Sequence, residues 1–260
     1  MPDKMRKFYI IILLLFISNF VSAQNNHIAW GLKLGGNIGA PIPFGNVPKG
    51  ATGAPIVGLN LGSWISYYFN PKISLKLEFN YSIKGASFKT PLENQNYEDE
   101  VYMYLPNGDS LINYIKTTFT GTAEGKFDNH YLEWPIYVQY KIGNKILLTG
   151  GGYFAYMFAT ATYANGEGYI GSLSGVIVTR TIPFEKELSK FDYGARLGVA
   201  YTNGGKFSFD GNLAFGISSI FKKSYKTIDY PINNFYFQFG VMYNLGKDLK
   251  FDAPKKSENI

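Results

Sequence analysis

Hydrophobic and polar residues alternate with a period of two along eight segments of this chain, which is typical of β-strands with one apolar and one polar face. The segments span residues 28–40, 56–69, 73–84, 129–142, 145–160, 190–202, 206–220 and 233–245. In 73–84, Leu75, Leu77 and Phe79 share one face, and Lys76 and Glu78 share the other. Each segment reaches the roughly 9–11 residues that a tilted membrane-spanning strand needs. The pattern predicts an all-β fold.

The connections between these segments alternate in length. Residues 70–72, 143–144 and 203–205 are short and rich in Asn, Gly and Pro, as in tight hairpin turns. Residues 41–55, 85–128, 161–189 and 221–232 form much longer connections. Short turns on one side and long loops on the other are typical of bacterial outer-membrane barrels. We therefore predict a closed eight-stranded antiparallel transmembrane β-barrel with short periplasmic turns and long extracellular loops.

Alternation alone does not say which face is outside, so a lipocalin-like soluble barrel fits the same pattern. Two features favour the membrane barrel. Aromatic residues on the apolar face gather beside the short turns, where a girdle would meet lipid headgroups. Residues of both charges lie on the polar face beside glycines, which suits a crowded lumen. The predicted lumen ion network consists of Lys76, Glu78, Glu133, Arg196 and Asp210. It is either a salt-bridged plug or a gated polar conduit.

The two ends of the chain have their own composition. Residues 1–23 combine basic Lys4, Arg6 and Lys7 with an apolar run and small residues before Gln24, which predicts a cleaved signal peptide. The alternative is a single membrane anchor. The barrel would span 24–245, and the polar residues 246–260 would form a periplasmic tail. The absence of cysteine excludes a lipid-anchoring thiol, disulfides and thiolate metal sites.

Composition agrees with a strand-and-turn protein in the envelope. Aromatic residues make up 17% of the chain, with 29 glycines and only 17% charged residues. The formal net charge of +6 is spread without a dense basic cluster, so no nucleic acid is expected as a partner. The expected partners are outer-membrane lipid and lipopolysaccharide, the barrel-insertion machinery and other envelope proteins.

Short motifs in the strands indicate a family. Gln238, Gly240, Tyr243 and Leu245 in the last segment look like the C-terminal insertion signal of outer-membrane barrels. Residues 131–142, with Leu132-Glu133-Trp134-Pro135, and residues 31–37 resemble strands of the PorT-like outer-membrane β-barrel family of Bacteroidetes. The resemblance implies this fold and location, and its named member belongs to a secretion and gliding apparatus. Because Pro135 cannot donate a ladder hydrogen bond, we also expect a bulge or local break there.

The second long connection carries the best candidates for partner contacts. Residues 101–105 and 111–119 flank a Pro-Asn-Gly-Asp turn and predict a hairpin rising above the membrane. Tyrosine is enriched in binding surfaces, so the candidate contacts are Tyr97, Tyr102, Tyr104 and Tyr114. The alternative is a loop that only shields the rim. Residues 176–181 predict a second extension.

Catalysis is a weaker alternative. His130 with Asp128 and Ser82 could be imagined as a lipid-modifying set, but no nucleophile motif accompanies them. We expect no catalytic residues, no cofactor and no metal site. The predicted function is non-enzymatic, either surface recognition or a part in an envelope or secretion assembly. A narrow small-solute channel and a lipid-modifying outer-membrane enzyme are the alternatives.

Overall fold

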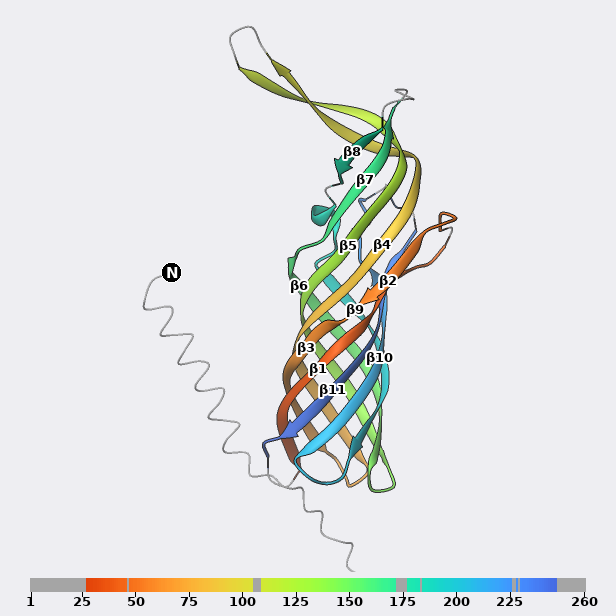
Figure 1. Ribbon diagram of the computed structural model, residues 1–260. Coiled ribbons are helices and arrows are strands. Elements are labelled where there is room, and N and C mark those ends of the chain that lie inside the picture. Colours follow the sequence, from red (N-terminus) through yellow and green to blue (C-terminus); the bar gives the residue numbers. More distant parts are fainter. Residues whose placement is uncertain are drawn as a thin grey trace, which may run out of the picture.

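The computed structural model of the protein describes residues 27–45, 47–104, 109–171, 177–182, 184–225, 228 and 230–246 (Figure 1). For residues 97–104, 110 and 112–115 the structure describes the backbone and not the side chains. The predicted signal peptide and nearly all of the predicted tail fall on residues that are not described, so both stay predictions.

Eight antiparallel strands form a closed ring, which confirms the predicted barrel. The ring closes where the first strand pairs with the last, from Gly31 opposite Asn244 to Pro43 opposite Ile232. Every predicted segment corresponds to one strand of the ring. In ring order the strands are β1 (Ile28–Pro43), β3 (Gly58–Tyr68), β4 (Ile73–Tyr104), β5 (Ser110–Ile142), β6 (Ile146–Thr160), β9 (Phe191–Thr202), β10 (Phe207–Ser219) and β11 (Ile232–Asn244).

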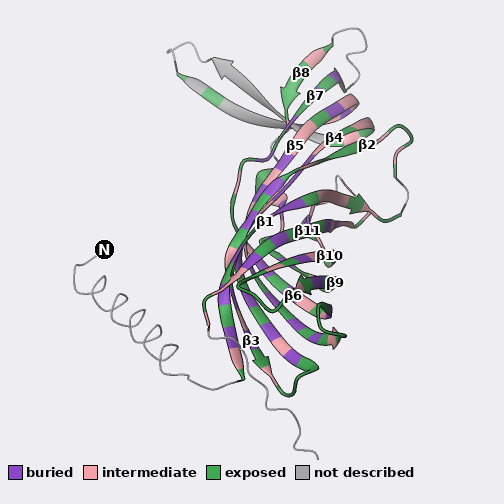
Figure 2. Cartoon of the chain, turned by 60° about the horizontal axis from the view of Figure 1, so that its bottom comes forward, coloured by how far each residue is buried: buried purple, intermediate pink, exposed green. Residues whose placement is uncertain are grey.

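Buried and exposed residues alternate along the strands of the barrel (Figure 2). The exposed residues are mostly apolar and face outward, and most of the buried residues that face the lumen are polar. Leu34 and Leu197 are each 62% exposed, whereas Asn37, Glu133 and Arg196 are fully buried. A soluble barrel would bury its apolar face, so the lipocalin-like alternative is wrong. Exposed aromatic residues lie beside the short turns, as predicted for a girdle: Trp30, Tyr67, Phe69, Tyr140, Tyr201 and Phe207.

The two ends of the barrel differ. At one rim, tight turns join β3 to β4, β5 to β6 and β9 to β10, and Gly143 and Gly204 there adopt positive φ angles of 59° and 82°. Glycine adopts this conformation without the steric cost that a Cβ imposes. At the opposite rim the connections are long, so the predicted asymmetry is present.

The long-loop end contains more strand than the sequence predicts. β4 and β5 continue as one hairpin from Gly85 opposite Asp128 to Tyr104 opposite Ser110. Three short strands, β2 (Thr52–Ile56), β7 (Tyr163–Ile170) and β8 (Val178–Thr181), complete a sheet in the order β2-β4-β5-β7-β8, which we call the extension sheet (Figure 1). The expectation of loop through 85–100 is therefore wrong. Backbone pairing sustains these strands although their sequences do not alternate strictly.

An apolar cluster closes the barrel at the long-loop end. We call it the apolar cap, and its buried members are Ala86, Phe127, Tyr131, Tyr153, Ala155, Met157, Ala164, Phe184, Leu188, Ala214, Ile220 and Phe221. A short 3₁₀ turn, η1 (Glu185–Glu187), separates Phe184 from Leu188. No helix in the described ranges is long and apolar enough to cross a membrane.

Pro135 interrupts one ladder of the ring. β4 and β5 pair at Leu77 opposite Ile136 and again at Asn80 opposite Glu133, with no register change across the gap. The interruption is the local break expected of a residue without an N–H.

Candidate functional site

In the half of the lumen nearer the short turns, four charged side chains from β1, β4 and β10 form a cluster that we call the lower cluster. Its members are Lys33, Lys76, Glu78 and Asp210. The amine of Lys33 donates to Asp210 at 2.5 Å and lies 3.4 Å from Glu78. Lys76 reaches the other oxygen of Glu78 at 2.5 Å. The amide of Asn80 donates to Glu78 at 2.8 Å. Two cations face two anions, so the lower cluster is neutral as a whole.

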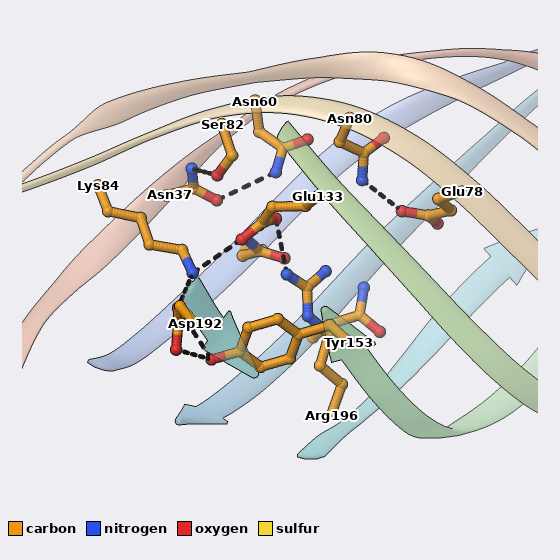
Figure 3. A network of polar contacts seen from close by, with 12 residues as sticks. Asn37, Asn60, Glu78, Asn80, Ser82, Lys84, Glu133, Tyr153, Asp192 and Arg196 are labelled. Atoms are coloured by element: carbon orange, nitrogen blue, oxygen red, sulfur yellow. Dashed lines mark hydrogen bonds and ion pairs between the residues drawn. The ribbon is translucent and has the colours of Figure 1, made fainter. Parts of the chain in front are cut away.

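A second cluster, the upper cluster, lies nearer the apolar cap and joins β4, β5 and β9 (Figure 3). Arg196 donates to Glu133 at 2.7 Å. Lys84 bridges Glu133 at 2.7 Å and Asp192 at 2.8 Å. All four side chains are at most 4% exposed, and their charges again sum to zero.

Neutral partners complete the upper cluster. Asp192 accepts hydrogen bonds from Tyr153 at 3.1 Å and from Asn234 at 2.8 Å. Glu133 accepts one from Gln238 at 3.2 Å. The ammonium of Lys84 lies 4.8 Å from the ring centre of Tyr153, within cation–π range. Buried ions persist only with such pairing, because desolvation of an unpaired charge costs several kcal/mol.

Tyr137 lies between the two clusters. Its hydroxyl accepts a hydrogen bond from Arg196 at 3.1 Å, and its ring centre is 5.8 Å from the amine of Lys76. The lumen is therefore filled with paired ions and aromatic rings from the lower cluster up to the apolar cap.

The structure places all five predicted network residues in the lumen, but it divides them. Lys76, Glu78 and Asp210 belong to the lower cluster, and Glu133 and Arg196 to the upper cluster. Sequence reasoning missed three partners that are equally buried: Lys33, Lys84 and Asp192. Lys84 shares the face of Lys76 and Glu78, so the period-two pattern could have found it.

The four insertion-signal residues have places of their own in the folded barrel. Gln238 donates to Glu133, and a Cβ at Gly240 would lie 2.9 Å from Cε of Lys33 and 3.0 Å from Oδ1 of Asp210. Tyr243 packs against Phe207 with ring centres 5.0 Å apart, and Leu245 donates its N–H to the Trp30 carbonyl. Their role in insertion stays a prediction.

The catalytic set imagined from the sequence is not assembled. His130 contacts the hydroxyl of Tyr81 at 2.6 Å and lies 3.6 Å from Asp128, and all three are partly exposed. Ser82 is on the opposite face, fully buried in the lumen, where its hydroxyl accepts a hydrogen bond from Asn37. Because Ser82 and His130 lie on opposite sides of the barrel wall, they cannot act on the same substrate. Among the described residues no group of His, Asp or Glu is arranged to hold a metal.

The tyrosine candidates for partner contacts lie on the extension sheet. Tyr97 pairs with Thr117, Tyr102 with Ile112 and Tyr104 with Ser110, and Tyr114 pairs with Glu100. Their side chains are among those not described, so a contact role stays a prediction.

Comparison with known proteins identifies the family. A family model described as an outer membrane protein beta-barrel domain matches residues 22–222. Among solved structures, Ail, the attachment invasion locus protein of Yersinia pestis, in complex with the heparin analogue sucrose octasulfate, is 13% identical, with 84% of this chain and 99% of that chain covered and a TM-score of 0.38. The translocator domain of autotransporter NalP from Neisseria meningitidis is 10% identical, with 92% and 95% covered and a TM-score of 0.24. No curated protein matches the chain. The chain belongs to the family of outer-membrane β-barrel domains, and it is located in the outer membrane.

Proposed function

We propose that this protein is a non-enzymatic surface barrel that recognises a partner through its extension sheet. The observation that carries the proposal is the length of two strands. β4 and β5 contain 32 and 33 residues, about three times the roughly 9–11 needed to span the membrane. The surplus forms a hairpin that projects far beyond the rim (Figure 1). A strand pair needs no such projection to anchor a barrel.

The extension sheet offers a surface suited to recognition. A groove of about 830 Å³ runs across it, between the β2–β4 side and the β5–β7 side. Tyr163 and Tyr169 line the groove together with the ion pair of Lys89 and Glu124 and a series of glycines. The exposed tyrosines give a partner both apolar contacts and hydroxyl groups for hydrogen bonds, and Lys89 and Glu124 add charged groups.

The sequence supports a more specific family, a route of export and a set of partners. The segment 131–142 and the opening strand support membership of the PorT-like barrels of Bacteroidetes, and residues 1–23 support export by a cleaved signal peptide. The proposed partners are envelope proteins and lipopolysaccharide, with the barrel-insertion machinery acting during assembly. The face separation of Ser82 and His130 supports the non-enzymatic assignment.

The test removes the projecting hairpin, the part of the extension sheet that carries the candidate tyrosines, and leaves the barrel and the residues of the groove in place. Residues 96–118 are replaced by a two-residue Asn-Gly turn between Gln95 and Phe119, which face each other in the ladder. Intact cells are cross-linked and the protein is purified from the outer membrane, with heat-dependent gel mobility as the measure of folding. The shortened protein should insert and fold but lose the envelope proteins that co-purify with the parent.

The matched control lacks residues 247–260, which follow Gly246 in the sequence. It should keep the co-purifying proteins. The reverse result, with partners lost only when the tail is removed, would refute recognition through the extension sheet.

A further inference from the structure

The wall of the barrel is split on one side near the long-loop rim. β1 pairs with β3 only as far as Asn37 opposite Gly58. Beyond that point, among the strands that the structure describes, β1 continues to Pro43 paired with β11 alone, and β2 pairs with β4 alone. The upper ends of β1 and β2 therefore face each other without a ladder between them, and we call this gap the lateral cleft.

Pro41 and Pro43 leave the edge of β1 that faces β2 without N–H donors for a neighbouring strand. Phe44 donates its N–H to Pro231, toward β11. Because successive N–H groups of a strand point to opposite edges, residues 41 and 43 would aim theirs into the lateral cleft. Both positions are proline and carry no N–H. An edge without donors has little need of a partner strand, so the lateral cleft is built into the sequence.

A chamber of about 540 Å³ lies behind the lateral cleft. Its volume falls within the roughly 300–1,000 Å³ of small-ligand sites. Phe127, Phe184 and Phe221 of the apolar cap line it, together with Phe88 and Ile232. Lys89 is the one charged residue among the described residues of the lining, and it is already paired with Glu124.

The apolar cap lies between the chamber and the upper cluster. Tyr131 and Tyr153 belong to the apolar cap, and their ring centres lie 4.9 and 4.8 Å from the amine of Lys84 in the upper cluster. A ligand that enters the chamber thus meets aromatic rings and then a neutralised ion cluster. This geometry is that of a binding site and not of a passage.

The outer side of the lateral cleft is apolar. Ile38 and Ile42 on β1 are each 38% exposed, and Val57, between β2 and β3, is 65% exposed. They continue the apolar surface that faces the membrane. Ile42 also lines the chamber, so apolar side chains extend from the outer face into it. A cavity lined by aliphatic and aromatic groups favours a hydrocarbon chain, since it offers water few hydrogen-bonding partners.

We propose that the chamber binds the acyl chain of an outer-membrane lipid, which enters sideways through the lateral cleft. This goes beyond the proposed surface recognition and does not depend on it, because the chamber is lined mainly by the apolar cap and β1, which do not line the groove of the extension sheet. The two hollows adjoin and share Thr52, Gly53, Ser87, Phe88 and Lys89.

The test is photo-cross-linking of the full chain in vesicles of phosphatidylethanolamine and phosphatidylglycerol. A small fraction of the phosphatidylethanolamine carries a diazirine in its acyl chain, and the modified residues are mapped by mass spectrometry. Adducts are expected on the outer face, at residues such as Leu213, and also inside the chamber at Phe184, Phe221 and Ile232. A parallel sample receives diazirine-bearing palmitic acid in place of the labelled lipid.

Two matched variants separate the chamber from the outer face. Ile232→Trp fills the chamber from β11, and Ile217→Trp adds the same ring on the exposed face of neighbouring β10. Both should show the parent's heat-dependent gel mobility. Ile232→Trp should lose the chamber adducts and keep those at Leu213, and Ile217→Trp should keep both. Adducts confined to the outer face, or chamber adducts that survive Ile232→Trp, would overturn the proposal. Chamber adducts from palmitic acid alone would overturn it in favour of a free fatty acid.

Discussion

Arg196 offers the sharpest test of the idea that the lumen is a stabilising plug. Its guanidinium is fully buried, donates to Glu133 and Tyr137, and lies 4.6 Å from the ring centre of Tyr153. Arg196→Met removes one cation and leaves the upper cluster with a net negative charge. Breaking a buried ion pair by removing one partner typically costs about 3–5 kcal/mol. We expect the lower end of that range, because Lys84 still contacts Glu133 at 2.7 Å.

The double variant Arg196→Met with Glu133→Gln makes the prediction specific. Each single change leaves an excess charge in the lumen, but the double change leaves Lys84 paired with Asp192 at 2.8 Å. The loss of unfolding free energy in the double variant should therefore be smaller than the sum of the two single losses by about 0.5–3 kcal/mol. Lys89→Met is the control, since its pair with Glu124 is more than half exposed and such pairs contribute at most about 1 kcal/mol.

The measurement is urea unfolding of the protein in lipid vesicles, followed by tryptophan fluorescence and by heat-dependent gel mobility. Trp64 lines the lumen and Trp134 faces the lipid, so both sides of the wall report on unfolding. If Arg196→Met loses no more stability than Lys89→Met, or if the two single losses simply add, the upper cluster is not a coupled unit and the reasoning fails.

Three further predictions concern packing, conduction and chemistry. Gly151→Ala should abolish folding, because its Cβ would lie 1.9 Å from the Ile136 carbonyl oxygen, whereas Gly150→Ala, whose Cβ meets only Leu197 at 3.4 Å, should keep the parent's gel mobility. The parent protein should be silent in planar bilayers, and discrete conductance steps would contradict a filled lumen. It should also leave phospholipid and lipopolysaccharide intact; turnover by the parent that disappears in His130→Ala would revive the enzyme alternative.

The barrel could be predicted from sequence because lipid imposes a strict rule on it. Every residue of a spanning strand faces either hydrocarbon or the lumen, so the period of two is enforced. The predicted segments match the observed strands within a few residues, except that β4 continues to Tyr104 and β5 begins at Ser110. This constraint does not apply to the part of the chain beyond the long-loop rim. The residues of β7, Tyr-Ala-Asn-Gly-Glu-Gly-Tyr-Ile, carry no alternation that would separate a strand from a loop.

The lumen could be predicted only in part, for a geometric reason. Alternation says that Glu133 and Arg196 point inward, but it does not say how far along the barrel axis each one lies. That depth depends on the stagger between strands, which brings Glu133 of β5 next to Arg196 of β9 although 63 residues separate them. The same stagger brings Lys33 of β1 next to Asp210 of β10. The sequence pattern therefore identified charged lumen residues without identifying their partners.

The plug and the extension sheet are connected through the strands that they share. β4 supplies Glu78 and Lys84 to the lumen clusters and β5 supplies Glu133, and these two strands then continue out of the membrane as the centre of the extension sheet. For a solute to pass, Arg196 and Lys84 would have to leave their partners, at a cost of several kcal/mol for each charge left unpaired. The same cost fixes β4 and β5 where they leave the barrel. A projecting sheet held on such a base loses less conformational entropy when it binds than a sheet on a flexible base, so a filled lumen favours recognition as well as stability.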